Sequence, residues 1–348
     1  MPDAATYAKC QTVPISGTAC AGQPTGNVCI ECLFGGNTYN NAQTPDATGT
    51  MEAGNYLLSV QLGGAAAGQT YISAESERGL LAPVTTAAGQ MVEYSFVVNV
   101  RAMEGQPNHA GGPGGYPGLD VFFSGPMATP PQVSAVGYAL STAATKPIMI
   151  YMASDSTECD QTGGAFGGWG QMLPEFFVPP IGISNYGNSG ASSSSFYGAY
   201  WGDIKKVWQP GDYAMIQFGH NDKGVADTAV QANLEKYVTD ALAANVTPIL
   251  VSPPARVQFG AGSTDGDQSS LHAISAKNAA AAHNVAFIDL TALSTAWYNT
   301  LGSQAAALKF HANGSDATHT NLDGGAKLAA LVAGDIKTQN LPLAKYLR

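Results

Sequence analysis

Four clusters of small polar residues could together carry out nucleophilic catalysis. The segment 154–157 (SDST) directly follows the apolar run 147–153 (PIMIYMA). The other three clusters are 185–195 (NYGNSGASSSS), 219–222 (GHND) and 316–319 (DATH). Between them they contain hydroxyl nucleophiles, imidazole bases, carboxylates that could orient a base, and amides that could stabilise an oxyanion. Acyl transfer requires this combination of groups.

The elements that must position these clusters alternate regularly after the proline-containing link 127–136 (MATPPQVSAV). Apolar runs separated by helical stretches, such as 228–244 and 271–283, predict a parallel sheet covered by helices on both faces. Three of the polar clusters follow the first three runs, and the fourth precedes a final helical stretch at 322–336. Ligands of such sheets bind at the carboxyl ends of the strands, where loops and helix N-termini converge. The apolar runs are 148–153, 181–184, 213–218, 246–251 and 285–290.

The first part of the chain has a different periodicity. Short extended segments are separated by turn-forming residues, which is typical of an all-β structure and indicates a sandwich. Alternation is clearest where Tyr94, Phe96, Val98 and Val100 fall on one face while Ser95 and Asn99 fall on the other. The glycine-rich segment 108–118 (NHAGGPGGYPG) predicts a surface loop. The segments that indicate strands are 56–62, 69–74, 93–101 and 119–125.

These patterns predict two domains. Residues 1–143 would form the β-sandwich, together with a cysteine-containing N-terminal segment, and residues 144–348 would form the α/β domain. The first domain resembles the galactose-binding-like sandwiches that are attached to some carbohydrate esterases. It would either bind sugar or only cap the second domain and complete its cleft.

The four polar clusters resemble the sequence blocks of the SGNH (GDSL-type) hydrolase superfamily, and the rhamnogalacturonan and pectin acetylesterases look most similar within it. The segment 154–157 with Gly168-Trp169-Gly170 resembles the first block, G-D-S-T…G-W-G. The segments 185–190, 219–222 and 316–319 resemble the Asn/Gly block, the G-x-N-D block and the D-x-x-H block. All four occur in the family's order within residues 147–340. The resemblance implies a flavodoxin-like three-layer α/β fold with a parallel sheet.

The resemblance also implies a role for individual residues. Ser156 would be the nucleophile, His319 the general base and Asp316 the carboxylate that orients the base. A separation of three residues lets one turn bring Asp316 to one imidazole nitrogen, which leaves the other nitrogen free to take the serine proton. The oxyanion would be stabilised by the backbone N–H groups of Ser156 and Gly190 and by the side-chain amide of Asn221.

Trp169 and His220 would contact the substrate, and no metal or other cofactor is implied for the chemistry. Three positions depart from the family pattern. Ser154 stands where the first block has glycine, and Ser189 replaces the first glycine of the pair in the Asn/Gly block. Ala191 stands where related acetylesterases tend to carry arginine after that pair.

Structural roles remain open for the same residues. A serine after a strand often caps a helix, and the aspartate at 316 could cap the final helix in the same way. Asn221 could be a turn residue that hydrogen-bonds to its own backbone. Trp169 could be a core aromatic side chain, and His220 could be structural. We expect Asp155 to be a hydrogen-bonding residue rather than a proton carrier.

Composition limits the classes of partner. Only 11% of the residues are charged and 41 are glycine, a composition more typical of exported proteins than of cytosolic enzymes. The formal net charge is −10, and there is no run of Lys or Arg, so nucleic acid and anionic membrane surfaces are poor partners. No apolar stretch approaches the roughly 20 residues that span a bilayer, and the start of the chain lacks a signal-peptide pattern. We expect a secreted protein that has lost its signal.

The five cysteines also favour an exported protein. Cys10, Cys20, Cys29 and Cys32 crowd into the N-terminal segment, which favours disulfides formed in an oxidising compartment. A zinc site is the alternative, although only the pair at 29 and 32 has the spacing of zinc ligands. We expect Cys159 to be a packed or unpaired thiol.

The resemblance therefore implies a secreted serine esterase that removes O-acetyl groups from a plant cell-wall polysaccharide of the pectin or rhamnogalacturonan type. The substrate would be an acetylated polysaccharide or oligosaccharide, and the intermediate an acyl-serine. The alternatives are an acetylxylan esterase, a lipid esterase or thioesterase with the same triad, and a non-catalytic carbohydrate-binding protein on a hydrolase scaffold.

Overall fold

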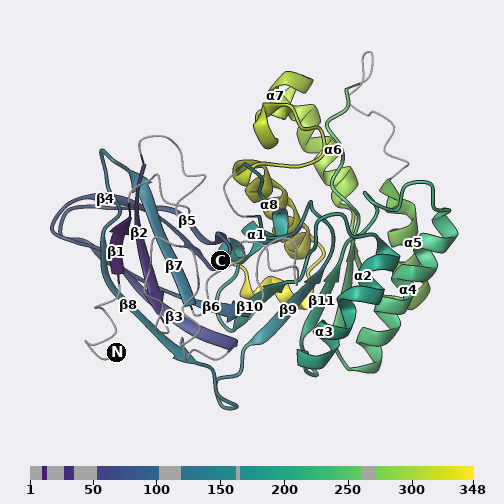
Figure 1. Ribbon diagram of the computed structural model, residues 1–348, viewed down its shortest axis with the longest axis horizontal. Helices are drawn as coiled ribbons and strands as arrows, with labels where there is room; N and C mark the ends of the chain where they lie inside the picture. Colours follow the sequence, from purple (N-terminus) through teal and green to yellow (C-terminus); the bar gives the residue numbers. More distant parts are fainter. Residues whose placement is uncertain (1–9, 14–26, 35–52, 102–118, 162–164, 260–270) are drawn as a thin grey trace.

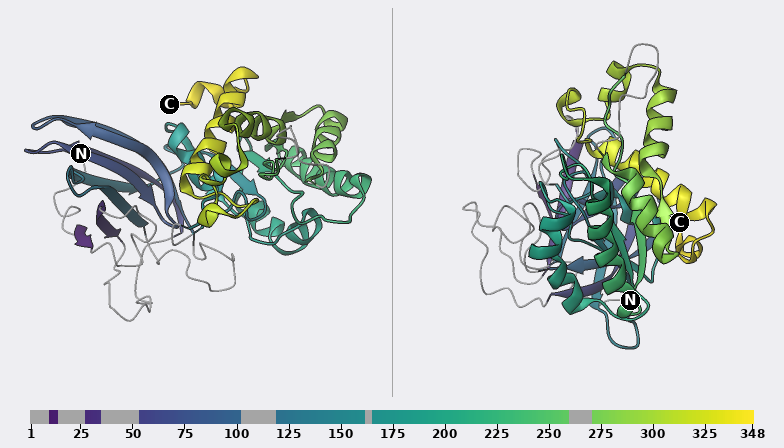
Figure 2. Two further views of the ribbon diagram at one scale, coloured as in Figure 1. Left: turned by 90° about the horizontal axis from the view of Figure 1, so that it is seen from above. Right: turned by 90° about the vertical axis from the view of Figure 1, so that its right-hand side faces the viewer.

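The computed structural model describes residues 10–13, 27–34, 53–101, 119–161, 165–259 and 271–348. These residues form an antiparallel β half and an α/β half, which lie at opposite ends of the molecule (Figures 1 and 2). The strands of the antiparallel half are β1 (Cys10–Val13), β2 (Asn27–Phe34), β3 (Gly54–Gly63), β4 (Gly68–Ala74), β5 (Arg78–Thr86), β6 (Met91–Val100), β7 (Leu119–Pro126) and β8 (Val133–Leu140). The strands of the α/β half are β9 (Ile148–Ala153), β10 (Ile181–Asn185), β11 (Tyr213–Ile216), β12 (Thr247–Val251) and β13 (Ala286–Ile288). Its helices are α1 (Trp169–Met172), α2 (Ser193–Ala199), α3 (Trp201–Val207), α4 (Asp227–Ala243), α5 (Ala273–His283), α6 (Leu290–Leu301), α7 (Gln304–Leu308) and α8 (Leu322–Thr338), with 3-10 turns at Leu173–Phe176, Ala312–Gly314 and Pro342–Tyr346.

One mixed sheet of eight strands runs through both halves. Its strand order is β13-β12-β11-β9-β10-β6-β3-β8. The strands from β13 to β6 pair in parallel, which confirms the predicted parallel sheet of the α/β half, and β6, β3 and β8 pair antiparallel. The halves join where Gly182 of β10 lies opposite Val97 of β6. The predicted boundary after residue 143 falls between β8 and β9, and the sheet continues across it.

A second sheet, of order β1-β2-β7-β4-β5, belongs to the antiparallel half. Buried side chains of both sheets form one core, which includes Leu58 of β3, Ile72 of β4 and Phe123 of β7. The predicted alternation in β6 is confirmed, because the side chains of Phe96, Val98 and Val100 are all buried in this core. Asn99, predicted on the polar face, is only 9% exposed, because the α/β half covers that face and the Ser184 hydroxyl donates to Asn99 Oδ1 over 2.6 Å.

The apolar sequence of β9 (IMIYMA) explains why helices cover both faces of the sheet. Met149 and Tyr151 point to one face, where they pack in a core with α4 and α5. Ile150 and Met152 point to the other face and pack with α1, α6 and α8 (Figure 1). The α8 helix begins directly after the fourth polar cluster, because the Asn321 side chain accepts a hydrogen bond from Gly324 N over 2.9 Å and caps it.

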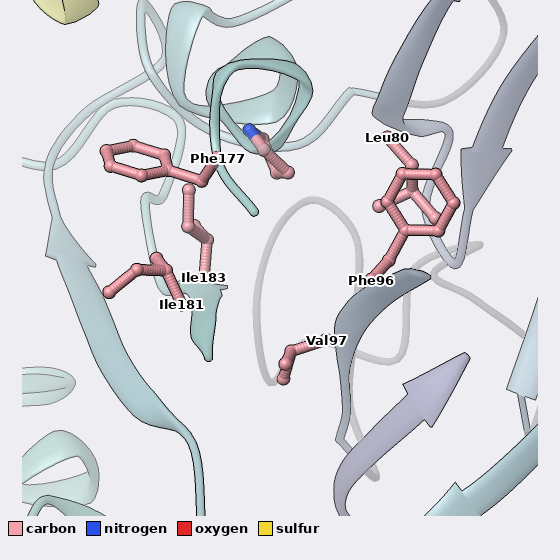
Figure 3. Close-up of a pocket in the computed structure, with 7 residues that line it drawn as sticks. Leu80, Phe96, Val97, Phe177, Ile181 and Ile183 are labelled. Carbon is pink, nitrogen blue, oxygen red and sulfur yellow. The ribbon is translucent and has the colours of Figure 1, made fainter. Parts of the chain in front are cut away.

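One part of the junction between the halves is apolar. Figure 3 shows a pocket at this junction. Leu80, Phe96 and Val97 of the antiparallel half lie on one side of it, and Phe177, Ile181 and Ile183 of the α/β half lie on the other. The lining residues are Leu80, Phe96, Val97, Pro174, Phe177, Ile181 and Ile183. Burial of these side chains holds the two halves together in addition to the shared sheet.

The cysteines behave as the disulfide hypothesis predicts where the structure describes them. Cys29 and Cys32 each take part in a disulfide, so neither can be a thiolate ligand and the zinc alternative is wrong for these two residues. Cys159 is a free, fully buried thiol, as expected. Cys20 and the glycine-rich segment 108–118 lie outside the described residues. In the part of the chain that the structure describes, no helix is both long and apolar enough to cross a bilayer.

The junction generates the first prediction. A Cβ atom on Gly182 would lie 2.6 Å from Val97 Cγ1 and 2.8 Å from Met149 Sδ, closer than packed atoms approach. We expect Gly182→Ala to lower the free energy of unfolding by about 1–3 kcal/mol, as overpacking typically does. Urea unfolding followed by circular dichroism measures the change.

Gly198→Ala is the matched control. A Cβ atom there has no neighbour within 4 Å, so this helix substitution should be neutral or stabilise the protein by up to about 1 kcal/mol. Equal stability of the Gly182 variant and the wild type would contradict the tight packing at the junction.

Candidate active site

The first and fourth polar clusters meet at the carboxyl end of β9. The Ser156 hydroxyl lies 2.9 Å from His319 Nε2, and His319 Nδ1 lies 2.9 Å from Asp316 Oδ2. Because a carboxylate can only accept, Nδ1 carries the proton and Nε2 is left to accept from the serine hydroxyl. The structure thus brings all three predicted triad side chains into one hydrogen-bonded chain across 163 residues of sequence.

The Asp316 carboxylate is held in its ionised form. Partial burial works to raise its pKa, but hydrogen bonds to the carboxylate outweigh burial and lower the pKa below its usual value. The donors are the His319 backbone N–H at 2.9 Å, the His319 ring and the Thr318 backbone N–H at 2.7 Å. An ionised Asp316 fixes the imidazole tautomer and can stabilise an imidazolium.

The loop after β9 exposes Ser156 by a local turn. The buried Asp155 side chain accepts from both the backbone N–H and the hydroxyl of Thr157, at 2.9 and 2.8 Å, as an Asx turn does. This is the hydrogen-bonding role expected for Asp155, and its burial raises its pKa. Ser154 is fully buried and does not have a left-handed φ, so a side chain is tolerated where the family has glycine.

The loop that follows β9 and carries Ser156, residues 154–161, is called the nucleophile loop below. The glycines of the G-W-G block let the chain pass very close to it. A Cβ atom on Gly168 would lie 2.2 Å from the Cys159 carbonyl oxygen. The preceding Gly167 exchanges two hydrogen bonds with Thr320, one from its N–H to the Thr320 carbonyl at 2.9 Å and one from the Thr320 hydroxyl to its carbonyl at 2.7 Å. The segment therefore clamps the end of β9 to the residues that follow His319.

The expected oxyanion donors lie on two loops beside Ser156. Gly190 has φ +78° and is the third residue of a turn closed by a 3.1 Å bond from Ala191 N to Asn188 O, a position that suits glycine. The exposed Asn221 donates through Nδ2 to Ala191 O at 3.0 Å, which joins the second and third clusters. Among the described residues, neither Ser156 N nor Gly190 N donates to a protein acceptor, so both remain free to bind an oxyanion.

Comparison with known proteins is consistent with this geometry. The model of the GDSL-like Lipase/Acylhydrolase family matches residues 152–326, half of the chain. The chain belongs to this family. It is a carboxylic ester hydrolase.

Two similar curated relatives come from Bacillus subtilis (strain 168). Rhamnogalacturonan acetylesterase RhgT is 28% identical over 221 residues, which are 58% of this chain and 95% of the relative. The probable rhamnogalacturonan acetylesterase YesY is 32% identical over 212 residues, 57% of this chain and 96% of the relative. The crystal structure of YxiM from the same species has a TM-score of 0.57 at 21% identity, over 96% of this chain and 89% of that chain, and therefore shares the fold.

The aspartate of the GHND block has a structural role in this GDSL-like hydrolase. The buried Asp222 carboxylate accepts from the Ser193 hydroxyl at 2.6 Å and from its backbone N–H at 3.1 Å, so it holds the start of α2 against the third cluster. The His272 ring donates to the Asp222 carbonyl at 3.0 Å. Sequence reasoning missed His272, because it lies 50 residues away and no spacing signals the contact.

Gly219 shapes the backbone before these residues. It has φ +155°, and a Cβ atom there would lie 2.0 Å from the Leu271 carbonyl oxygen. The close approach explains why this block begins with glycine.

The two predicted substrate contacts are wrong. Trp169 is fully buried, and its indole N–H donates to Gln217 Oε1 over 2.9 Å, so it is a core residue rather than a stacking platform. His220 is only 3% exposed. Burial first, and the positive charge of Arg256 second, lower the pKa of His220 to about 3, so the ring is neutral and enclosed. Sequence alone cannot distinguish a buried aromatic ring from an exposed one at these positions.

No group of three or more His, Cys, Asp or Glu side chains that could hold a metal ion occurs within the described ranges.

The geometry predicts that a substitution of Asn221 lowers kcat without a large change in the free energy of unfolding. Asn221→Ala should lower kcat on p-nitrophenyl acetate by about 10²–10³-fold, the usual effect of losing one oxyanion donor. The side chain is exposed, so the free energy of unfolding should change by no more than about 1 kcal/mol. Asn233→Ala is the control, because this amide donates to the Ser193 hydroxyl at 3.1 Å and, among the described residues, makes no hydrogen bond to a triad side chain. Equal kcat values for the two variants would remove Asn221 from the oxyanion site.

Proposed function

We propose that this esterase is a secreted carbohydrate esterase that removes O-acetyl groups from an acetylated plant cell-wall polysaccharide of the pectin or rhamnogalacturonan type. The observation that carries the chemistry is the hydrogen-bonded chain from Ser156 through His319 to Asp316. The observation that favours the substrate is the similarity to RhgT and YesY, which covers nearly the full length of both.

The geometry accounts for each step of acetyl transfer. As Ser156 Oγ attacks the acetyl carbonyl carbon, its proton passes to His319 Nε2, and Asp316 stabilises the resulting imidazolium. The negative charge on the carbonyl oxygen is stabilised by the N–H groups of Ser156 and Gly190 and by the Asn221 amide. The intermediate collapses, His319 returns the proton to the departing sugar hydroxyl, and an acetyl-Ser156 remains. A water molecule, deprotonated by His319, attacks the acetyl group in the same way and releases acetate.

The accessibility of the triad suits a bulky polar substrate. The His319 and Asp316 side chains are 31% and 29% exposed, so an acetyl group on a polymer can reach them. A long acyl chain would need an apolar groove next to the serine. None of the exposed large apolar side chains in the described part of the chain belongs to the four polar clusters. They are Leu57, Met91, Met127, Leu140, Val207, Val225, Leu242 and Ile274.

The antiparallel half supports the proposal of an exported protein. We propose that it is a galactose-binding-like β-sandwich, and its two layers of antiparallel strands around one core support this proposal. Disulfide-bonded Cys29 and Cys32 fit an oxidising compartment, and the low charged fraction fits an extracellular protein.

Acetate release from a substrate panel tests this function. The wild type should release acetate from acetylated rhamnogalacturonan and pectin faster than from acetylated xylan, and it should hydrolyse p-nitrophenyl acetate far faster than the octanoate. Ser156→Ala should lower every rate by at least about 10³-fold, because the nucleophile is gone. Preference for octanoate would favour a lipid esterase instead. Binding to the polysaccharides without turnover of any ester would favour a carbohydrate-binding protein.

The mechanism assigns no step to a metal ion, which gives a second test. Dialysis against EDTA should leave kcat on p-nitrophenyl acetate within about twofold of the untreated enzyme, because N–H donors alone stabilise the oxyanion. A larger loss that added Ca²⁺, Mg²⁺, Mn²⁺ or Zn²⁺ restores would contradict this part of the proposal. Thermal unfolding before and after dialysis serves as the control for a purely structural ion.

A further inference from the structure

We propose that Arg78, which belongs to the antiparallel half, is a positioning residue for the loop that carries the Gly190 oxyanion donor. This loop, residues 186–191, is called the oxyanion loop below. The inference rests on the proposed function for its catalytic consequence. It makes the antiparallel half an integral part of the active site rather than an appended module.

Arg78 crosses from the antiparallel half into the base of the active site. It is the first residue of β5 and is only 2% exposed. Its Nε donates to Asp160 Oδ2 over 2.9 Å, and its Nη1 donates to the Asn99 and Ile183 carbonyl oxygens at 3.3 Å. The guanidinium therefore contacts β6, the middle of β10 and the nucleophile loop simultaneously.

Asp160 connects Arg78 to Asn185, because its carboxylate hydrogen-bonds to both side chains. It lies four positions after Ser156, and its carboxylate is 1% exposed. Its second oxygen, Oδ1, accepts from Asn185 Nδ2 over 3.0 Å. The same amide nitrogen donates to the Glu158 carbonyl at 2.9 Å, so Asn185 is bound twice to the nucleophile loop.

Asn185 in turn fixes the start of the oxyanion loop. Its Oδ1 accepts from Gly187 N over 2.9 Å, and Asn188 N donates to the Ser154 carbonyl at 3.0 Å. A Cβ atom on Gly187 would lie 2.6 Å from the Ser154 hydroxyl, so the two loops are in direct contact. A continuous set of buried bonds thus runs from Arg78 to the turn that presents Gly190.

A second arginine from the same half holds the other side of the loop. Arg101, directly after β6, donates to the Asn185 carbonyl and places its guanidinium 4.2 Å from the centre of the Tyr186 ring. Two cations of the antiparallel half therefore hold the segment that enters the oxyanion loop.

The buried pair makes the effect of a substitution predictable. Without Arg78, the buried Asp160 carboxylate would lose the guanidinium that lies 2.9 Å from its Oδ2 atom, and loss of one partner of a buried ion pair is strongly destabilising. This loss alters the bond of Asp160 to Asn185 and releases the oxyanion loop. Displacement of a catalytic donor by about 1 Å can lower a rate by about 10²-fold.

The relatives place a limit on the inference. RhgT and YesY match over nearly their full length while covering 58% and 57% of this chain, so family chemistry does not in general need an antiparallel half. In this chain, the buried Asp160 carboxylate lies against the antiparallel half. Its negative charge is the reason why the active site of this chain requires Arg78 from that half.

The test compares Arg78→Met with Arg78→Lys and with the control Arg348→Met. Arg348 also bridges the halves, since it donates to the Phe177 carbonyl at 3.1 Å and lies 5.3 Å from the Phe96 ring. Within the described part of the chain, Arg348 makes no hydrogen bond to either active-site loop. We expect Arg78→Met to lower kcat on p-nitrophenyl acetate by about 10–100-fold with KM nearly unchanged, because donor placement acts on the transition state. Arg78→Lys should recover part of the loss, and Arg348→Met should keep kcat within about twofold of the wild type.

A readout that does not require turnover separates this inference from the proposed function. Amide hydrogen exchange of the peptide containing residues 185–191 should accelerate in Arg78→Met and stay unchanged in Arg348→Met. If Arg78→Met does not fold, the double variant Arg78→Met/Asp160→Asn removes both charges of the buried pair, and its faster exchange and lowered kcat would support the same conclusion. Wild-type exchange and kcat in a folded Arg78→Met would overturn the inference. An inactive wild type whose exchange still depends on Arg78 would instead overturn the proposed function alone.

Discussion

The structure depends on the hydrogen bond between the Ser156 hydroxyl and His319 Nε2, because the two residues come from distant parts of the chain. The bond requires the end of β9 and the loop before α8 to meet at one place. Gly167 and Gly168 make that approach feasible, since a side chain on either would collide with a neighbouring backbone. Small residues between the two loops are therefore as necessary to the triad as the reactive groups themselves.

Burial separates the acidic groups around the serine into two kinds. Asp155 and Glu158 are fully buried beneath the nucleophile, and burial raises the pKa of each, which favours the uncharged form. Asp316 is partly exposed and receives three hydrogen bonds, so its pKa is lowered and it stays ionised. The negative charge next to the histidine is thereby concentrated on the carboxylate that orients it. Asp160 is the exception beneath the site, and the Arg78 guanidinium compensates its charge.

Because the sheet is continuous, the first half of the chain contributes side chains that support the active site. Parallel pairing of β6 with β10 places polar and cationic side chains of the antiparallel half beside the strand that leads into the oxyanion loop. Asn99 bonds to Ser184, and Arg78 and Arg101 bond to the segment around it. The two halves therefore share a core boundary, a sheet and the supports of one loop, and motion between them would disturb the catalytic geometry.

The sequence by itself determined the local features. Apolar runs located the five parallel strands to within a few residues, because strand periodicity is encoded locally. The resemblance of four ordered sequence blocks to the SGNH hydrolases predicted the roles of Ser156, Asp316 and His319, because these blocks are short local motifs. Tertiary structure decided what depends on burial and on distant partners. Trp169 and His220 are enclosed, the Asp222 carbonyl accepts a hydrogen bond from His272, and one mixed sheet continues from the first predicted domain into the second. Whether a side chain faces solvent, and which charge lies beside it, is set by packing between segments that are far apart in the chain.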